Sequence, residues 1–231
     1  MNTLKRTMVH LGVAALLALA HMACSGCEVI AFGVDAIDSE QEVEFVARYD
    51  GLNGKRIAVL IDAPFDAQYE HPRAVPGLCD LISAALRESC AGARILPPNY
   101  VVAYQANNIY WPTMDIEDIA KALKVERLVI VDLVEYRLMA PGNGYLWDGV
   151  IVGDINIYEA DSLDATAIAF KERIKVRYPM LDGVRRDQYP QATIEQALQI
   201  KFAQDTANLF RNYTRKKGDI KDEIRKERHR S

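Results

Sequence analysis

The segment Arg56–Ala63 (RIAVLIDA), a continuous run of mostly apolar and β-branched residues, constrains the fold more than any other. Apolar side chains at consecutive positions point to both faces of a strand, so this strand is expected to be buried on both sides, as in parallel sheets covered by helices. After a long loop, Pro76 and Gly77 open a predicted helix that continues to about Cys90 with apolar residues at helical spacing. The folded part therefore begins as a strand followed by a helix.

The next segments continue this alternation of helices and strands. Arg94–Leu96 is predicted as a short second strand, and helical segments are expected at 99–106 and 115–123. Thr113 is the expected N-cap residue of the second of these helices. Alternation of this kind favours an α/β fold.

Three long strands follow and complete the predicted sheet. Arg127–Met139 leads through a hairpin signal rich in Pro and Gly into Tyr145–Glu159, and Thr166–Tyr178 is the third strand. In the third strand apolar and charged residues alternate, so one face is dry and the other is wet. Gly149 and Gly153 in the middle strand leave room for a covering helix. This pattern predicts an antiparallel meander that is covered on one side.

A last helix follows the meander. A capping box at Thr193–Gln196 marks its predicted start, and apolar residues between Ile194 and Tyr213 lie along one side. The order of elements is β-α-β-α-β-β-β-α, which defines an α/β (α+β) fold. We expect a single mixed-sheet sandwich, with an antiparallel three-strand meander at the end of the sheet, in residues 42–213.

The first residues are interpreted as an export signal rather than as part of the fold. Lys5 and Arg6 precede ten apolar or glycine residues at Leu11–Ala20, a length typical of a signal-peptide core and too short to cross a bilayer. The small residues before Cys24 and Cys27 resemble the lipobox of bacterial lipoproteins, in which a diacylglycerol is attached to the cysteine thiol. Cys27, which follows Ser-Gly, is the favoured attachment site, and Cys24 is the alternative.

This resemblance implies that residues 1–26 are a lipoprotein signal peptide and that residues 27–41 link the lipid anchor to the domain. An ordinary secretory leader without lipid is the alternative interpretation. The residues after the two cysteines are Ser25 and Glu28 rather than aspartate. By the sorting habit of these lipoproteins, the protein is expected in the cell envelope, on the periplasmic face of the outer membrane where the cell has one.

Charge is distributed unevenly along the chain. Residues 214–231 carry eight Lys and Arg against four Asp and Glu, and they are expected to form a charged, solvated tail that cannot bury a face. Residues 27–213 carry 18 basic and 28 acidic side chains, a net charge of −10. This acidic body argues against binding of nucleic acid, which requires a basic domain.

Two sequence stretches resemble a known group of envelope domains. GKRIAVL at Gly54–Leu60, together with AKALKVERLVIVDL at Ala120–Leu133 and the long hairpin that follows, resembles the TolB amino-terminal type. CsgG-type secretion lipoproteins and the lipoprotein activators of penicillin-binding proteins share this architecture. The resemblance covers roughly residues 55–211 and lies in the order of elements, so it assigns no site residue. It implies a non-catalytic protein that contacts envelope partners, although the charges in the hairpin argue against a membrane-spanning ribbon.

One acidic loop is the candidate for chemistry. The motifs of serine hydrolases, zinc proteases and nucleotide-binding enzymes do not occur. Asp62, Asp66, Glu70 and His71 follow the first buried strand, where open α/β sheets bind ligands. Three carboxylates and an imidazole are able to ligate a divalent metal or to form an acid/base pair. A plain polar loop is the alternative interpretation, and we predict neither an enzyme, a metal nor a cofactor.

A row of cations marks the wet face of the last strand. Lys171, Arg173, Lys175 and Arg177 occupy alternate positions, about 7 Å apart. Cross-strand pairing with Asp154, Glu159 or Asp132 is one interpretation. A docking ridge for an acidic partner protein or an anionic envelope polymer is the other.

The cysteines and tryptophans of the folded part are expected mainly in the core. Cys79 and Cys90 are expected to be buried thiols that form no disulfide, and Trp147 is expected in the core. Trp111, in a loop bounded by proline, is interpreted either as an exposed binding anchor or as a cover over the core.

The preferred function is therefore that of a non-catalytic, lipid-anchored envelope protein acting through protein–protein contacts in envelope assembly, transport or wall maintenance. The alternatives are a secreted metal-dependent hydrolase that uses the Asp62–His71 loop and an envelope protein that binds a small ligand. The sequence leaves the oligomeric state open.

Overall fold

The computed structural model describes residues 40–228, which fall into two compact units. The larger unit comprises Val46–Tyr213, and the smaller one comprises the described residues up to Phe45 together with those from Thr214 onward. No helix among the described residues is both long and apolar enough to cross a membrane.

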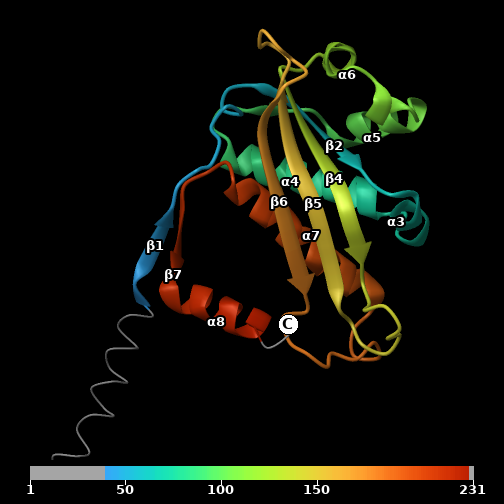
Figure 1. Ribbon diagram of the computed structural model, residues 1–231, viewed down its shortest axis with the longest axis vertical. Helices are drawn as coiled ribbons and strands as arrows, with labels where there is room; N and C mark the ends of the chain where they lie inside the picture. The colour runs from blue at the N-terminus through green and yellow to red at the C-terminus, as the bar shows by residue number, and fades with distance from the viewer. Residues whose placement is uncertain (1–39, 229–231) are drawn as a thin grey trace, which may run out of the picture. The chain divides into compact units, whose positions relative to one another are not determined.

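The larger unit is built on a five-stranded mixed sheet with strand order β3-β2-β4-β5-β6 (Figure 1). Strand β2 pairs in parallel with β3 and β4, whereas β4, β5 and β6 form an antiparallel meander. The bounds of the strands are β2 Arg56–Asp62, β3 Arg94–Ile95, β4 Arg127–Arg137, β5 Gly149–Glu159, and β6 Ile168–Tyr178. The predicted α/β fold with a meander at the end of the sheet is confirmed.

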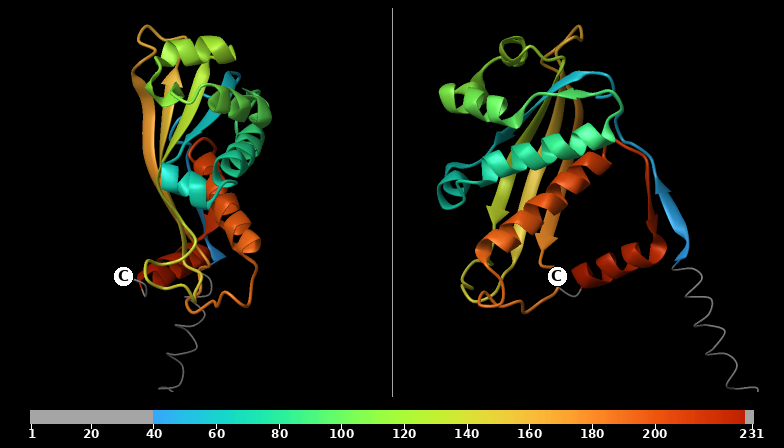
Figure 2. Two further views of the ribbon diagram at one scale, coloured as in Figure 1. Left: turned by 90° about the vertical axis from the view of Figure 1, so that its right-hand side faces the viewer. Right: turned by 180° about the vertical axis from the view of Figure 1, so that it is seen from behind.

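Helices α4 and α7 pack together and against the same face of the sheet (Figure 2). The opposite face of β5 and β6 has no helix in front of it in Figure 1. The bounds of the helices in this unit are α3 Phe65–Glu70, α4 Ala74–Ser89, α5 Pro98–Asn107, α6 Ile116–Leu123 and α7 Gln191–Asn208, with a 3₁₀ turn at Trp111–Thr113.

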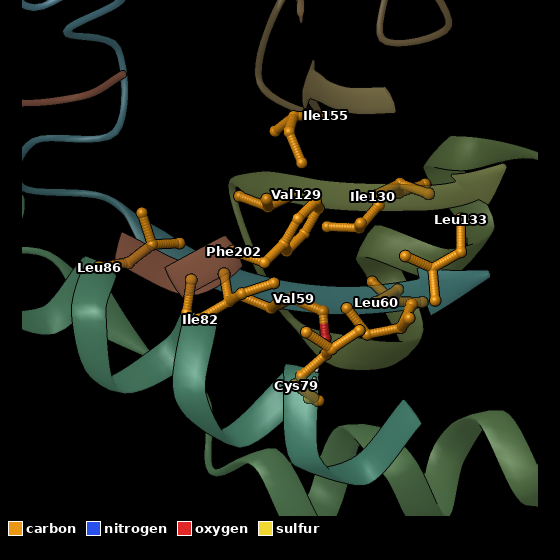
Figure 3. Packing of buried hydrophobic residues seen from close by; sticks show 14 of the residues in the cluster. Val59, Leu60, Cys79, Ile82, Leu86, Val129, Ile130, Leu133, Ile155 and Phe202 are labelled. Carbon is orange, nitrogen blue, oxygen red and sulfur yellow. Dashed lines mark hydrogen bonds between the residues drawn. The ribbon is translucent and has the colours of Figure 1, made fainter. Parts of the chain in front are cut away.

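The hydrophobic core lies between the sheet and helices α4 and α7. Figure 3 shows Phe202 of α7 among Val129 of β4 and the apolar side chains of α4. A Cβ atom built on Gly149 or Gly153 of β5 would lie 3.0 Å from Leu198 or Phe202 of α7, respectively. These glycines therefore leave space for a covering helix, as the sequence predicts.

Both tryptophans are buried, Trp111 to 6% exposure and Trp147 to 4%. Trp147 belongs to the core as expected, and for Trp111 the structure selects the covering role over that of an exposed anchor. Cys79 and Cys90 are buried free thiols, in agreement with prediction. Burial raises the pKa of Cys79 to about 12 and that of Cys90 to about 11.

Two predicted helix caps are wrong. Thr113 lies in the 3₁₀ turn, where its hydroxyl donates to the carbonyl oxygen of Tyr110, and Asp115 is the N-cap residue of α6. Thr193 lies inside the first turn of α7, which begins after Pro190. A proline at a helix start loses no helical hydrogen bond, because the first N–H groups of a helix have no partner within it.

The start of the preceding helix also differs from prediction. Helix α4 begins at Ala74, two residues before the predicted start at Pro76, so Pro76 lies within its first turn. The short helix α3 stands where a loop was expected.

The smaller unit contains a two-stranded sheet and one helix. Strand β1 (Glu42–Phe45) pairs with β7 (Tyr213–Lys216), and α8 (Lys217–Arg228) follows directly. No side chain of α8 for which burial is described is buried. The segment expected as a charged, solvated tail therefore contains regular structure, and its side chains for which burial is described are exposed or half-buried.

Candidate functional site

The four cations of the predicted ridge lie on the face of the sheet that α4 and α7 leave uncovered. In the register of β5 and β6, Lys171 is opposite Asn156, Arg173 opposite Asp154, Lys175 opposite Val152, and Arg177 opposite Val150. The other face of the same strand carries Ile174 and Val176, which are buried. Since β6 is the outer strand of the sheet, the four cations stand along an edge. We call Lys171, Arg173, Lys175 and Arg177 the cationic ridge.

Cross-strand pairing accounts for part of the cationic ridge. Arg173 donates two hydrogen bonds to Asp154, at 2.5 and 3.0 Å, and Lys171 lies 3.3 Å from the same carboxylate. The hydrogen bond from Arg173 lowers the pKa of Asp154. Arg177 is 3.3 Å from Asp148. Of the three carboxylates proposed from the sequence as partners, only Asp154 forms ion pairs with the ridge among the described residues.

Lys175 is the cation of the ridge that has no ion-pair partner among the described residues. Its side chain is exposed, and no carboxylate of the described residues lies within ion-pair distance of it. Lys171 and Arg173 keep 54% and 61% of their side-chain surface exposed even while they are paired. The ridge thus remains available to a partner in solution.

Two carboxylates lie farther across the same open face. Asp62 at the end of β2 is in register with Asp132 of β4, and Asp132 accepts a 2.7 Å hydrogen bond from the Asn156 amide. Burial raises the pKa of both aspartates, and the charge of Asp62 raises that of Asp132 further. The open face therefore runs from carboxylates on β2 and β4 to cations on β6.

The structure does not gather the four residues of the predicted Asp62–His71 loop. Asp62 lies at the end of β2, whereas Asp66 and Glu70 are exposed on α3. His71 packs against the ring of Tyr136, with 5.0 Å between the ring centroids. Within residues 40–228, no group of three or more His, Cys, Asp or Glu side chains is placed to hold a metal ion.

A groove between α4, α5 and α7 contains functional candidates that sequence reasoning missed. Glu195 and Gln199 of α7 are only 6% and 5% exposed, and both line this groove of about 840 Å³. The hydroxyl of Tyr136 donates to Glu195 at 3.2 Å and accepts a 2.8 Å hydrogen bond from Gln199. Burial raises the pKa of Tyr136.

Close helix packing explains why these polar groups are buried. A Cβ atom built on Gly77 of α4 would lie 2.5 Å from the Gln199 side-chain oxygen, so glycine allows α4 and α7 to approach here. In the sequence Glu195 and Gln199 are spaced four residues apart, as are many residues on solvated helix faces. The one sequence feature that indicates close packing here is Gly77, near the start of its helix. A glycine does not tell which residues of another helix pack against it.

The proposed lipid attachment residues, Cys27 and Cys24, lie outside the described residues, as do the signal peptide and the first part of the linker. Lipid attachment therefore remains a prediction from the sequence.

Comparison with known proteins finds similar folds at low similarity. No protein-family model matches the sequence, and no curated protein matches it. A PelC dodecamer from Paraburkholderia phytofirmans has a TM-score of 0.41 and 14% identity, over 74% of this chain and 97% of that chain. Lipoprotein GNA1162 from Neisseria meningitidis has a TM-score of 0.41 and 10% identity, over 65% of this chain and 96% of that one.

A third similar structure is the hypothetical protein CT253 from Chlamydia trachomatis, with a TM-score of 0.39 and 12% identity, over 67% of this chain and 96% of that one. None of these findings names the TolB amino-terminal family that the sequence resembles. The similarities are of architecture alone, so function is inferred below from the residues of this chain.

Proposed function

We propose that the chain is a lipid-anchored protein of the bacterial cell envelope that acts by binding an acidic partner protein through the cationic ridge. The signal-peptide pattern and the lipobox before Cys27 support the anchor. Two or three acyl chains on one cysteine hold a protein firmly to a membrane, since each buried methylene contributes about 0.8 kcal/mol.

The observation that carries the binding role is the exposure of the cationic ridge on an otherwise acidic body. Residues 27–213 have a net charge of −10, yet four cations follow one another along the open face of β6. Asp154 and Asp148 neutralise only part of this charge, and a cationic surface attracts acidic partners and speeds their encounter. Charged residues on an edge strand also oppose sheet-to-sheet aggregation, so the test must separate the two roles.

The test compares two double charge reversals that change the net charge equally. Lys171→Glu/Lys175→Glu alters the ridge and leaves the Arg173–Asp154 pair in place. The control is Arg87→Glu/Lys121→Glu, which reverses two exposed cations on helices α4 and α6. Both proteins are expected to fold, because exposed ion pairs contribute at most about 1 kcal/mol.

Each variant and the parent chain is expressed in a bacterium that processes lipoproteins, crosslinked in cells and analysed by mass spectrometry. We expect an acidic protein to be crosslinked to the parent and to the control in a salt-sensitive manner, and to be lost from the ridge variant. The same set of crosslinked proteins for all three would refute the docking role. Loss of a crosslinked anionic polymer, without any protein, would refute the protein partner.

The lipid anchor is tested independently with radiolabelled palmitate. We expect the parent chain and Cys24→Ser to be labelled and to fractionate with membranes, whereas Cys27→Ser is unlabelled. Labelling that is lost in Cys24→Ser and kept in Cys27→Ser would assign the attachment site to Cys24. A parent chain without label would support the ordinary secretory leader.

A further inference from the structure

The groove between α4, α5 and α7 has the dimensions and lining of a small-molecule site. Its volume of about 840 Å³ lies within the range of ligand cavities, which have mostly apolar walls and a few converging polar groups. Its walls include Pro76 of α4, Val102 and Ala103 of α5, and Ala192 of α7. These helices cover the sheet face opposite to the cationic ridge, so this inference goes beyond the proposed function and does not depend on it.

The groove holds a buried carboxylate whose charge is poorly compensated. Glu195 accepts one hydrogen bond, from the neutral hydroxyl of Tyr136, which has no second proton to donate and itself accepts from Gln199. The nearest cation, Arg73, lies 4.0 Å from the second oxygen of Glu195, beyond hydrogen-bond distance, and its side chain is 75% exposed. A buried carboxylate is costly unless it is both paired and hydrogen-bonded.

The groove has two carboxylates against a single cation, Arg73, and the amides of Asn99, Gln196 and Gln199 both donate and accept hydrogen bonds. The side-chain oxygen of Gln199 receives no hydrogen bond from the described residues, and Asp80 of α4 adds a second carboxylate to the lining. Arg73 supplies the opposing charge, but its side chain lies largely in water. The lining therefore complements a donor with a positive charge.

We propose that this groove binds a small organic cation, an ammonium group on an apolar body, with the ammonium against Glu195 and the apolar body against α5. The ammonium would give Glu195 the charge-assisted hydrogen bond that it lacks in the protein alone. The apolar body would displace water from the small side chains of Val102 and Ala103.

The test uses two probes of the same shape and opposite charge, cyclohexylmethylamine and cyclohexanecarboxylate. Each is titrated at neutral pH into the ¹⁵N-labelled full chain carrying Cys24→Ser and Cys27→Ser, and backbone amide shifts give the site and the Kd. We expect the amine to bind at least about tenfold more tightly than the carboxylate. The largest shifts are expected in α4, α5 and α7 near Gly77, Ala103 and Gln196.

Two variants locate the interaction within the groove. Glu195→Gln keeps an acceptor for Tyr136 but removes the charge, so the amine should lose about tenfold in affinity or more. The matched control is Glu88→Gln, which removes an exposed carboxylate from α4 and should leave the Kd unchanged. Ala103→Trp fills the groove from an exposed position of α5 and should abolish binding even where Glu195→Gln fails to fold.

Three results would overturn the assignment. These are equal affinity for the two probes, no saturable shift with either, or amine binding that survives Ala103→Trp. None of the groove substitutions touches the cationic ridge, so in the parent chain, with Cys24 and Cys27 in place, they should leave its crosslinks unchanged whatever the groove binds.

Discussion

The pKa values of two aspartates on the uncovered face of the sheet are shifted in opposite directions because their neighbours differ. Burial and the charge of Asp62 raise the pKa of Asp132, whereas the hydrogen bond from Arg173 lowers the pKa of Asp154. The carboxylate of Asp132 therefore costs stability, and the carboxylate of Asp154 contributes stability. The same face of the sheet therefore carries one carboxylate that destabilises the fold, Asp132, and one that stabilises it, Asp154.

Stability measured as a function of pH should separate these two residues. Below the ordinary pKa of 3.8, Asp132 is protonated in both the folded and the unfolded state and contributes no difference. As the pH rises past that value the unfolded state ionises first, so the folded state loses relative stability. We therefore expect Asp132→Asn to raise the Tm at pH 7 and to leave it nearly unchanged at about pH 3.

Asp154→Asn is the matched control on the same face, and its effect should have the opposite sign. The lowered pKa means that ionised Asp154 stabilises the fold above pH 3.8, and that this contribution disappears as the pH falls through the still lower folded value. We expect a lower Tm at pH 7 and a smaller difference in acid. Destabilisation by Asp132→Asn at pH 7 would contradict the assignment of a raised pKa.

At the scale of elements, the approach of α7 to β5 depends on two glycines. A Cβ atom on Gly149 would lie 2.7 Å from the carbonyl oxygen of Tyr178 in β6 and 3.0 Å from Leu198 in α7. The first of these atoms is backbone within the sheet and has little freedom to move. Helix α7 is therefore able to approach β5 at this point because Gly149 has no side chain.

Gly149→Ala should consequently destabilise the protein by about 1–3 kcal/mol, the usual cost of overpacking a well-packed interior. Urea denaturation followed by circular dichroism measures the difference. Gly144→Ala is the control, because nothing lies within 4 Å of a Cβ atom built there. It should leave stability unchanged or raise it by up to about 1 kcal/mol. Equal effects of the two substitutions would mean that α7 does not constrain β5 at this point.

At the scale of the whole molecule, Cys79 and Cys90 report on the integrity of the core. Both thiols are buried, and burial raises their pKa to about 12 and 11, so almost no thiolate forms at neutral pH. Reagents that attack thiolates must wait for the core to open.

We expect Ellman's reagent at pH 8 to label these cysteines in the folded chain more slowly than in the urea-unfolded chain, by a factor on the order of 10³ or more. The chain used carries Cys24→Ser and Cys27→Ser, so that only the two core thiols are counted. Rapid labelling of either residue without denaturant would show that the core near α4 opens locally. A mass two daltons below the reduced value would reveal an unexpected disulfide.

The local patterns of the sequence determined the strands and the side each residue faces. The consecutive apolar residues of 56–63 fix a strand buried on both faces, and the alternation in 168–178 fixes a dry and a wet side. The four cations of the ridge follow from that alternation, because the period of a strand is two residues. Helix caps were predicted less well, since Thr113 and Thr193 each have the right residue type in the wrong place.

Tertiary structure alone decided which polar residues share a site. The burial of Glu195 and Gln199 depends on α4, more than a hundred residues earlier in the chain, and the scattering of Asp66 and Glu70 depends on the short helix α3. The periodicity of a helix tells which residues share its faces, and the partner of each face depends on packing between distant segments. The sequence thus predicted the strands of the sheet and the row of cations on β6, and the N-terminal export signal remains a prediction. Only the packing of three helices created the groove with its buried carboxylate.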